Sequence, residues 1–351
     1  MVVYFLMNSL FLGAGLFNMF ALSKEATIIC AGIGSIIGVI PISIYLYLFK
    51  NSGGRNIFEL NLYLFGKIIG GLLNLILSTL ALFISVIVLY NLTMFVNLNY
   101  LVLTNKVYIA FLFILPVIYG VSKGGTAIAK LAQILIYVCV LFFVLSVVGL
   151  VEIIRIDNLL PMFTSSLKSC IYSVLTYVAL NTVPLFLILC VSKKDMLEDK
   201  NFSKRVYLTY FLSSLSTITV FFITLSGLGY SVVAILKYPE FLILKQISYG
   251  KVIERVENIL SIYFILPMLI TTMFSVYYSF VNFNMYCNNK VYKKSLVYIL
   301  PLIVFFISMN CFENMTISTN FNMKFLPLII GGVAMGIHLL LFLRVHCRKK
   351  F

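Results

Sequence analysis

Charge is what this sequence has least of. Only 11% of its 351 residues are Asp, Glu, Lys or Arg, whereas soluble domains contain roughly 25%. So small a share excludes a soluble globular protein. Tryptophan is absent, and the two histidines, His338 and His346, have no carboxylate near them in sequence, so we expect both at the membrane interface.

Chemistry-bearing motifs are missing as well. No phosphate-cradling glycine loop and no metal-ligand spacing occur. The cysteines are seven, an odd number, and lie mostly inside apolar runs, which is typical of packing residues and not of a disulfide framework. We therefore expect no enzyme, no cofactor and no metal site.

Long hydrophobic runs are what the sequence has instead. Apolar residues make up 62% of it and the mean hydropathy is +1.08. Uncharged runs of 18 or more residues indicate transmembrane helices. Together with the slightly shorter Val107–Ser122 they predict ten spans in one domain over residues 1–351. The other spans are Met1–Ser23, Ala26–Phe49, Ile68–Asn105, Leu131–Val151, Ser169–Ser192, Val206–Leu236, Asn258–Asn289, Ser295–Phe312 and Phe325–Leu343.

The placement of the basic residues predicts an orientation. A net charge of +15 would suit a nucleic-acid binder, but with ten spans and the N-terminus inside, most of the 26 basic residues fall in loops on one side. Short cytoplasmic loops of membrane proteins carry such an excess, and it attracts anionic lipid. We therefore predict cytoplasmic N- and C-termini, the lipid bilayer as a partner and no nucleic acid.

Ten spans divide into two halves of five around the loop 152–168. We predict a first repeat at about 1–151 and a second at about 166–345. An odd number of spans per half gives the halves opposite orientations, the arrangement of inverted-repeat transporters, in which the first helix of each half is broken near the midplane. The expected fold class is an all-α polytopic membrane protein with a 5+5 inverted repeat and broken helices 1 and 6.

Helix breakers lie at matching places in spans one and six. Span one contains Gly13 and Gly15, and span six contains "YVALNTVPLF", in which Pro184 cannot donate a backbone hydrogen bond. Both interruptions lie roughly 18 Å from the start of their span. Helix packing explains single small residues equally well, but the pairing favours a ligand site. The candidate ligand-binding residues are Gly13, Ala14, Gly15, Tyr90, Asn181, Thr182, Thr271 and Thr272.

Three segments carry a family resemblance. They are "YPEFLILKQISYGKVIERVENIL" (238–260), "GGRNIFELNLYLFGKIIGGLLNLIL" (53–77) and "GGTAIAKLAQILIYV" (124–138). They resemble the B subunits of spore germination receptors, which are relatives of the amino acid-polyamine-organocation permeases. The resemblance implies a permease fold, a small nutrient such as an amino acid as ligand, and a role in triggering germination. It also implies companion subunits, a larger membrane subunit and a lipoprotein, in the spore inner membrane or the cell membrane of a spore-former.

Alternatives stay open at this point. A proton-coupled amino acid permease and a scaffold whose pocket no longer binds a ligand fit the residues equally well. Lys130 is the one cation inside an otherwise apolar helix; it either snorkels to the headgroups or supplies the charge of an ion site, as a span-five lysine does in related proton-coupled permeases. We expect the segment 238–260 to lie on the extracellular surface as an amphipathic helix. There Glu254, Arg255 and Glu257 form either a weak surface ion pair or a docking site for a partner.

Overall fold

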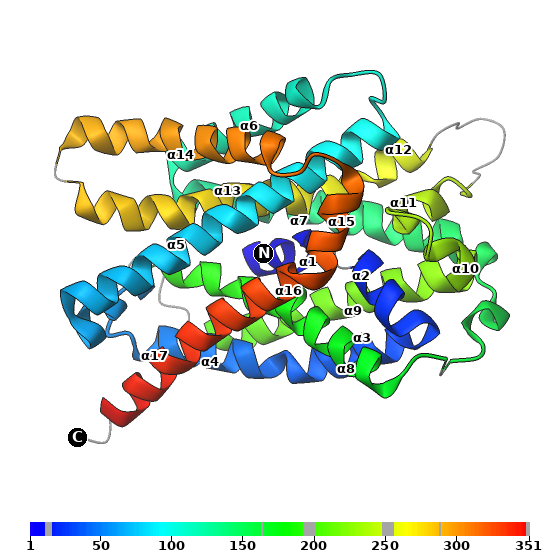
Figure 1. The fold of residues 1–351 in the computed structure, drawn as a ribbon, viewed down its shortest axis with the longest axis horizontal. Helices are drawn as coiled ribbons and strands as arrows, with labels where there is room; N and C mark the ends of the chain where they lie inside the picture. The colour runs from blue at the N-terminus through cyan, green and yellow to red at the C-terminus, as the bar shows by residue number, and fades with distance from the viewer. Residues whose placement is uncertain (11–15, 163, 192–200, 248–255, 288, 349–351) are drawn as a thin grey trace.

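The computed structural model describes residues 1–10, 16–162, 164–191, 201–247, 256–287 and 289–348. Across these ranges the secondary structure is helical and contains no strand. Most helices run roughly along the long axis of the molecule (Figure 1). The protein is thus an all-α polytopic membrane protein, as predicted. The inverted relation between its two halves stays a prediction.

Nine helical segments among the described residues are long and apolar enough to cross a membrane. The tenth predicted span, the first in the chain, contains α1 (Val2–Ser9), which is too short to cross a membrane by itself, and α2 (Leu16–Ser23), which from Phe17 on belongs to the first of the nine segments, Phe17–Asn51. The remaining α-helices are α3 (Thr27–Ile37), α4 (Val39–Asn51), α5 (Ile57–Asn99), α6 (Lys106–Lys123), α7 (Gly125–Leu150), α8 (Leu167–Tyr177), α9 (Phe202–Leu228), α10 (Tyr230–Val233), α11 (Pro239–Leu244), α12 (Val256–Leu260), α13 (Ile262–Tyr286), α14 (Lys290–Asn310), α15 (Met315–Lys324), α16 (Leu326–Leu328) and α17 (Met335–Arg348).

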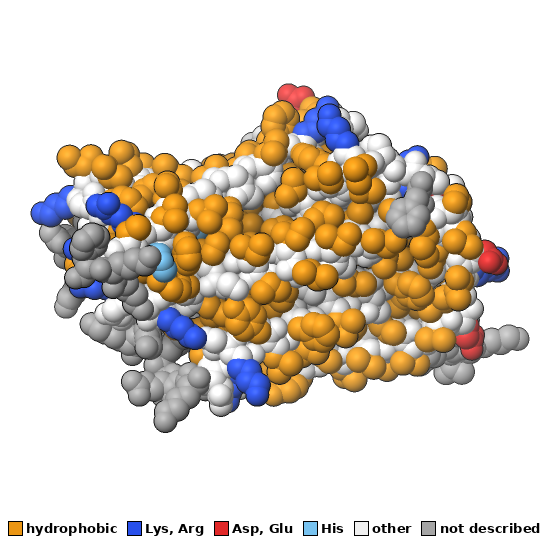
Figure 2. Space-filling view, turned by 90° about the horizontal axis from the view of Figure 1, so that it is seen from below, with side chains coloured by type: hydrophobic (Ala, Val, Ile, Leu, Met, Phe, Trp, Pro, Cys, Tyr) orange, Lys and Arg blue, Asp and Glu red, His pale blue; other side chains and the backbone are white. Residues whose placement is uncertain are grey.

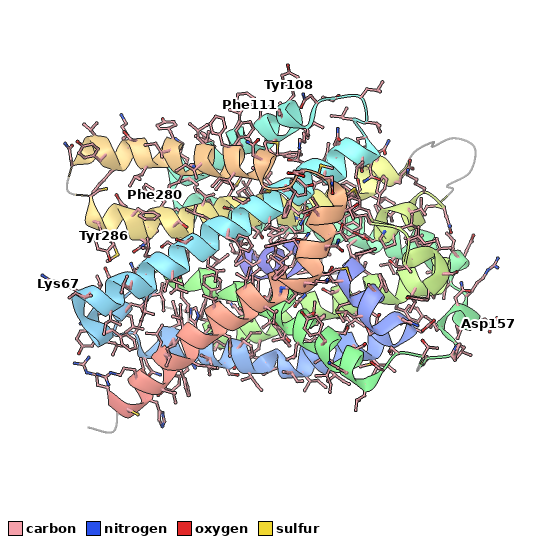
Figure 3. All side chains as sticks on the ribbon, in the orientation of Figure 1. Lys67, Tyr108, Phe111, Asp157, Phe280 and Tyr286 are labelled. Carbon is pink, nitrogen blue, oxygen red and sulfur yellow. The ribbon has the colours of Figure 1, made fainter. Side chains whose placement is uncertain are left out.

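Burial separates interior helices from peripheral ones. The span Leu167–Cys190 is 89% buried, whereas Gly125–Ile153 and Val291–Asn310 are each only 22% buried. Helix α13 packs against α1, α5, α6 and α7 and so holds the first helix inside the bundle. The peripheral helices show exposed apolar side chains such as Tyr108 and Phe111 of α6 (Figure 3), as lipid-facing surfaces require.

Charged side chains gather at the two ends of this long bundle. A broad belt of hydrophobic side chains covers the face seen in Figure 2, and most Lys and Arg on that face lie toward its left end. Figure 3 shows Lys67 at this end and Asp157 at the opposite one. We call the end with Lys67 and the Arg344–Arg348 part of α17 the basic end. The belt between charged ends is the pattern that a bilayer imposes.

The start of α5 shows how local sequence sets a helix entry. The Asn56 side chain accepts a hydrogen bond from the Glu59 backbone amide, and the Glu59 carboxylate accepts one from the Asn56 backbone amide. This reciprocal pair is a capping box. Gly66 then adopts a positive φ of 77° and turns the chain. The side-chain amide of Asn61 donates a hydrogen bond of 2.7 Å to the carboxamide oxygen of Asn74. This bond joins the part of α5 before Gly66 to the longer part after it.

Two corrections concern burial. Helix α11 of the segment 238–260 does not lie on the surface, because its Glu240 and Phe241 are buried and Phe241 packs 5.4 Å from the ring of Phe95. His338 is likewise not interfacial: it is fully buried, its ring lies 5.0 Å from that of Tyr45, and Nδ1 is 2.6 Å from a backbone carbonyl oxygen. In both cases aromatic neighbours from distant segments cover residues whose own sequence looks interfacial.

Close packing of α3 onto α8 depends on Gly34. A Cβ added there would lie 2.8 Å from the ring of Tyr177, which is fully buried, whereas a Cβ at Gly32 would meet nothing within 4 Å. We expect Gly34→Ala to lower the unfolding free energy by about 1–3 kcal/mol through overpacking. Gly32→Ala, the matched control, should leave it unchanged or slightly raised. Thermal unfolding of the two purified variants checks this, and equal melting temperatures would contradict it.

Candidate functional site

The first predicted span is described in two parts. Helix α1 ends at Ser9, and the described part of α2 starts at Leu16. The candidates Gly13, Ala14 and Gly15 lie outside the described residues. The two helices nevertheless bracket the position where the break was predicted.

The second predicted interruption lies at the end of α8. After Tyr177 the chain continues as the π-helical turn η5 (Val178–Thr182) and then as the 3₁₀ helix η6 (Val183–Cys190). Pro184 sits at the start of η6, where its missing amide interrupts the α-helical hydrogen bonds. Single π turns of this kind are frequent at functional sites. Asn181 and Thr182 are both fully buried in the turn.

The interrupted segments meet at α1. The amide of Asn181 donates to the Met7 carbonyl over 3.3 Å, and the Thr271 hydroxyl of α13 donates to the Phe5 carbonyl over 3.2 Å. Two of the predicted ligand residues, from helices far apart in sequence, therefore hold the last turn of α1 just before its break. The carboxamide oxygen of Asn181 has no hydrogen-bond partner among the described residues.

A buried polar network that the sequence analysis missed adjoins this contact. Asn8 donates to the Ser213 hydroxyl over 2.9 Å and accepts from Thr217 over 3.0 Å. Thr217 also lies 3.5 Å from the Asn181 amide. The sequence contained one sign of this network, because Asn8 is an amide residue inside an apolar run. Only the fold shows that α9 lies beside it.

The other predicted ligand residues lie elsewhere. Thr272 donates to the Met268 carbonyl of its own helix over 2.8 Å. Tyr90 of α5 is buried against Phe312, with ring centroids 5.0 Å apart. The structure therefore brings Asn181 and Thr271 to α1 but leaves Thr272 and Tyr90 in separate surroundings.

Lys130 and the acidic segment complete the set of candidates. Lys130 is exposed on α7, as expected of a side chain that reaches for the headgroups. Glu254 and Arg255 lie outside the described residues. Glu257 is half-buried in α12.

A cavity of about 740 Å³ lies beside the start of α7, α9 and the end of α13. Its lining includes Val3, Gln133, Arg205 and Tyr277. The volume suits a small organic molecule, and the side chains that line it are more polar than those of the lipid-facing surface. The cavity is close to the basic end, because the N-cap of α5, Asn56, also lines it.

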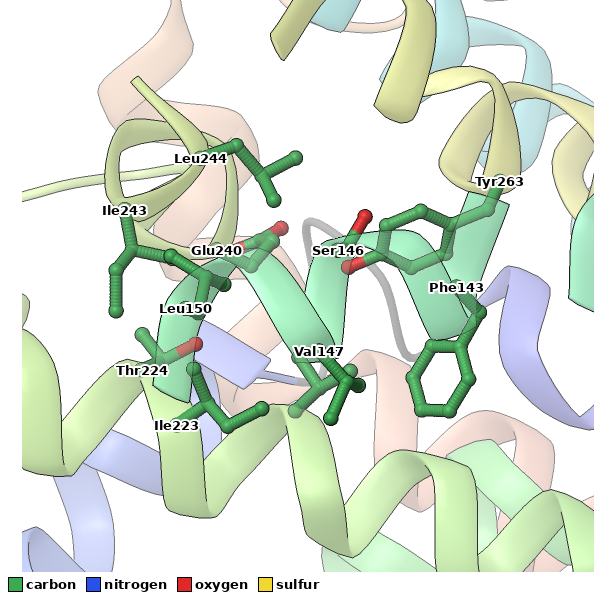
Figure 4. A pocket seen from close by; sticks show the side chains of 11 residues that line it. Phe143, Ser146, Val147, Leu150, Ile223, Thr224, Glu240, Ile243, Leu244 and Tyr263 are labelled. Atoms are coloured by element: carbon green, nitrogen blue, oxygen red, sulfur yellow. The ribbon is translucent and has the colours of Figure 1, made fainter. Parts of the chain in front are cut away.

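A much smaller cavity lies toward the opposite end, between α7, α9, α11 and α13 (Figure 4). Its volume is about 10 Å³, room for roughly one water molecule. Glu240 faces it together with Ser146, Thr224 and Tyr263. Helix α11 thereby inserts a carboxyl group into the bundle and closes it at this end.

The contact of Thr271 with α1 is testable against its neighbour. We expect Thr271→Val to destabilise the protein by about 0.5–1.5 kcal/mol, because the hydrogen bond that joins α13 to the Phe5 carbonyl of α1 is lost. Thr272→Val is the matched control, since the Met268 carbonyl that it serves keeps its place within an intact helix. Thermal unfolding of both variants is the measurement, and a larger effect of Thr272→Val would refute the assignment.

Comparison with known proteins gives one match. A family model described as spore germination protein, a spore permease, matches residues 1–317. No curated protein matches the chain.

Proposed function

The chain belongs to the spore germination protein family, and on that basis we propose that it is the membrane subunit of a nutrient germinant receptor. Membership makes it a permease-like membrane protein with a role in spore germination. Beyond that role, we propose that it binds a small nutrient, an amino acid, in a mid-membrane pocket and passes a conformational change to partner subunits.

One observation carries the ligand-binding part of the proposal. The π turn η5 and helix α13 both reach the carbonyl groups of α1 directly before its break, through Asn181 and Thr271. In a bilayer, irregular backbone is tolerated where it is buried in protein or lines a cavity. Two interruptions in contact at one place in the interior thus support a binding site there.

The chemistry of the place suits an amino acid. The break proposed at Gly13–Gly15 would expose backbone amides ahead of α2, and the amides at a helix N-terminus favour a carboxylate. The Asn181 oxygen, unpartnered among the described residues, would accept a hydrogen bond from an ammonium group. An amino acid carries both groups a few ångströms apart.

A second function, proton-coupled amino acid transport, is favoured by the cavity of about 740 Å³ near the basic end. A transporter must release its substrate to the cytoplasm, and a cavity on that side would serve as the exit. In this case Lys130 would supply the ion-site charge, although its exposure on α7 places it on the lipid side of the helix.

Partners and location follow from the same proposal. A larger membrane subunit and a lipoprotein would complete the receptor in the spore inner membrane, with both termini in the cytoplasm. Glu254, Arg255 and Glu257 remain the proposed docking residues on the outer side.

We expect Gly15→Leu to abolish the germination response or amino acid binding while the protein still inserts and folds. A leucine side chain would fill the space beside the break. The measurements are germination of spores that carry the variant, and its protein level in the spore membrane. A full response at normal protein level would remove the site from the first span.

Sensing and transport are separated by uptake of labelled amino acids into liposomes that contain the purified protein. A receptor subunit should bind its ligand, detected as a raised melting temperature, without accumulating it. Proton-driven accumulation above the level of empty liposomes would instead establish the permease.

A further inference from the structure

Lys237 is a half-buried residue whose ammonium group is inaccessible and for which the described residues supply no counter-ion. It precedes α11, and its Nζ is inaccessible and has no hydrogen-bond partner. The neighbours of the ammonium are aromatic: Nζ lies 5.9 Å from the ring centroid of Tyr90 and 5.7 Å from that of Tyr238. Burial lowers the pKa of Lys237 to about 8, so the side chain is still mostly charged at neutral pH.

Other unpartnered polar atoms lie around Tyr90. The hydroxyl of Ser318, on α15, lies beside that of Tyr90 but outside hydrogen-bond geometry. One turn further along α15, the Asn322 carbonyl accepts from Asn18 of α2 over 2.7 Å. The carboxamide oxygens of Asn18 and Asn322 both lack partners among the described residues.

Buried polar groups are nearly always paired with protein or water, and an unpaired buried charge is more demanding still. An aromatic face attracts a cation but does not replace a counter-ion. Several such groups from α2, α5, α15 and the segment before α11 therefore indicate a polar guest. The C-terminal part of α5, together with α11 and α15, lies toward the end of the molecule opposite Lys67 (Figures 1 and 3).

We propose that Lys237 and Ser318 bind the carboxylate of a small amino acid beside the ring of Tyr90. The amide oxygens of Asn18 and Asn322 then face its ammonium group. A single ammonium balances one negative charge, which suits a monocarboxylate better than a phosphate, and the rings of Tyr90 and Phe312 suit an apolar body.

This inference deepens the proposed function and rests on it for the identity of the ligand. The proposed carboxylate site itself uses no residue of the breaks in spans one and six. It also accounts for Tyr90, which the sequence singled out but which does not contact α1.

The test uses sodium acetate as a carboxylate probe and sodium chloride at equal ionic strength as its control. Thermal unfolding of the purified protein over a range of concentrations yields an apparent dissociation constant. We expect acetate to raise the melting temperature of the wild type and of Lys237→Arg. In Lys237→Met the dissociation constant should rise about tenfold or more, because a charge-assisted hydrogen bond is lost.

Lys245→Met is the matched control. Lys245 lies on the same segment, with Nζ 5.0 Å from the ring of Phe241, but it is exposed. Its removal should leave the acetate effect unchanged. Without any probe, Lys237→Met should unfold at a higher temperature than the wild type, since an apolar side chain of similar shape replaces an unpaired buried charge.

Three outcomes would overturn the site: no acetate effect on the wild type, an equal effect on Lys237→Met, or an equal effect of chloride, which would indicate a general anion site. A lower melting temperature of Lys237→Met without probe would show that the ammonium has a protein partner.

The same assay with an equimolar mixture of the twenty amino acids separates the two proposals. An acetate effect that depends on Lys237, without any stabilisation by amino acids, leaves a carboxylate site at Lys237 but removes the amino acid as its ligand, and the proposed function with it.

Discussion

Backbone hydrogen bonding inside the bilayer is the constraint on which the rest of this structure depends. Lipid offers no partner to a free carbonyl or amide, so a helix can be interrupted only where protein supplies the missing bonds. Here Asn181, within the interruption after α8, donates to the Met7 carbonyl near the end of α1, and Thr271 of α13 donates to the Phe5 carbonyl. Because these bonds join side chains of two other segments to the backbone of α1, the position of the end of α1 depends on how α1, α8–η6 and α13 are packed.

The same constraint explains the distribution of polar residues. Peripheral helices such as α7 and α14 expose apolar side chains, and a lysine on such a helix, Lys130, is exposed where it can reach the headgroups. Some interior polar residues are paired across helices, as in the bonds of Asn8 to Ser213 and Thr217. The ammonium group of Lys237 has no such partner among the described residues, and an unpaired inaccessible charge of this kind in a membrane protein points to a ligand more readily than to stability.

Closure of the bundle is asymmetric between its two ends. Away from the basic end, α11 is inserted among α7, α9 and α13 and leaves room for about one water molecule beside Glu240. Near the basic end a cavity of about 740 Å³ remains. A protein with one end packed and the other hollow has the form expected of one state of an alternating-access cycle, which either a transporter or a sensor with the same fold would use.

The sequence by itself determined the class of protein, nine of its spans and the place where the helix after Tyr177 is interrupted, whereas the break predicted in span one lies outside the described residues. Transfer of apolar side chains into lipid and the conformational limits of Gly and Pro act locally, within one run of residues. Tertiary structure alone decided the burial of His338 and α11, the different bonds of Thr271 and Thr272 on one helix, and the isolation of Lys237. These depend on which helix lies opposite, and the hydropathy of a single run contains no information about its neighbours.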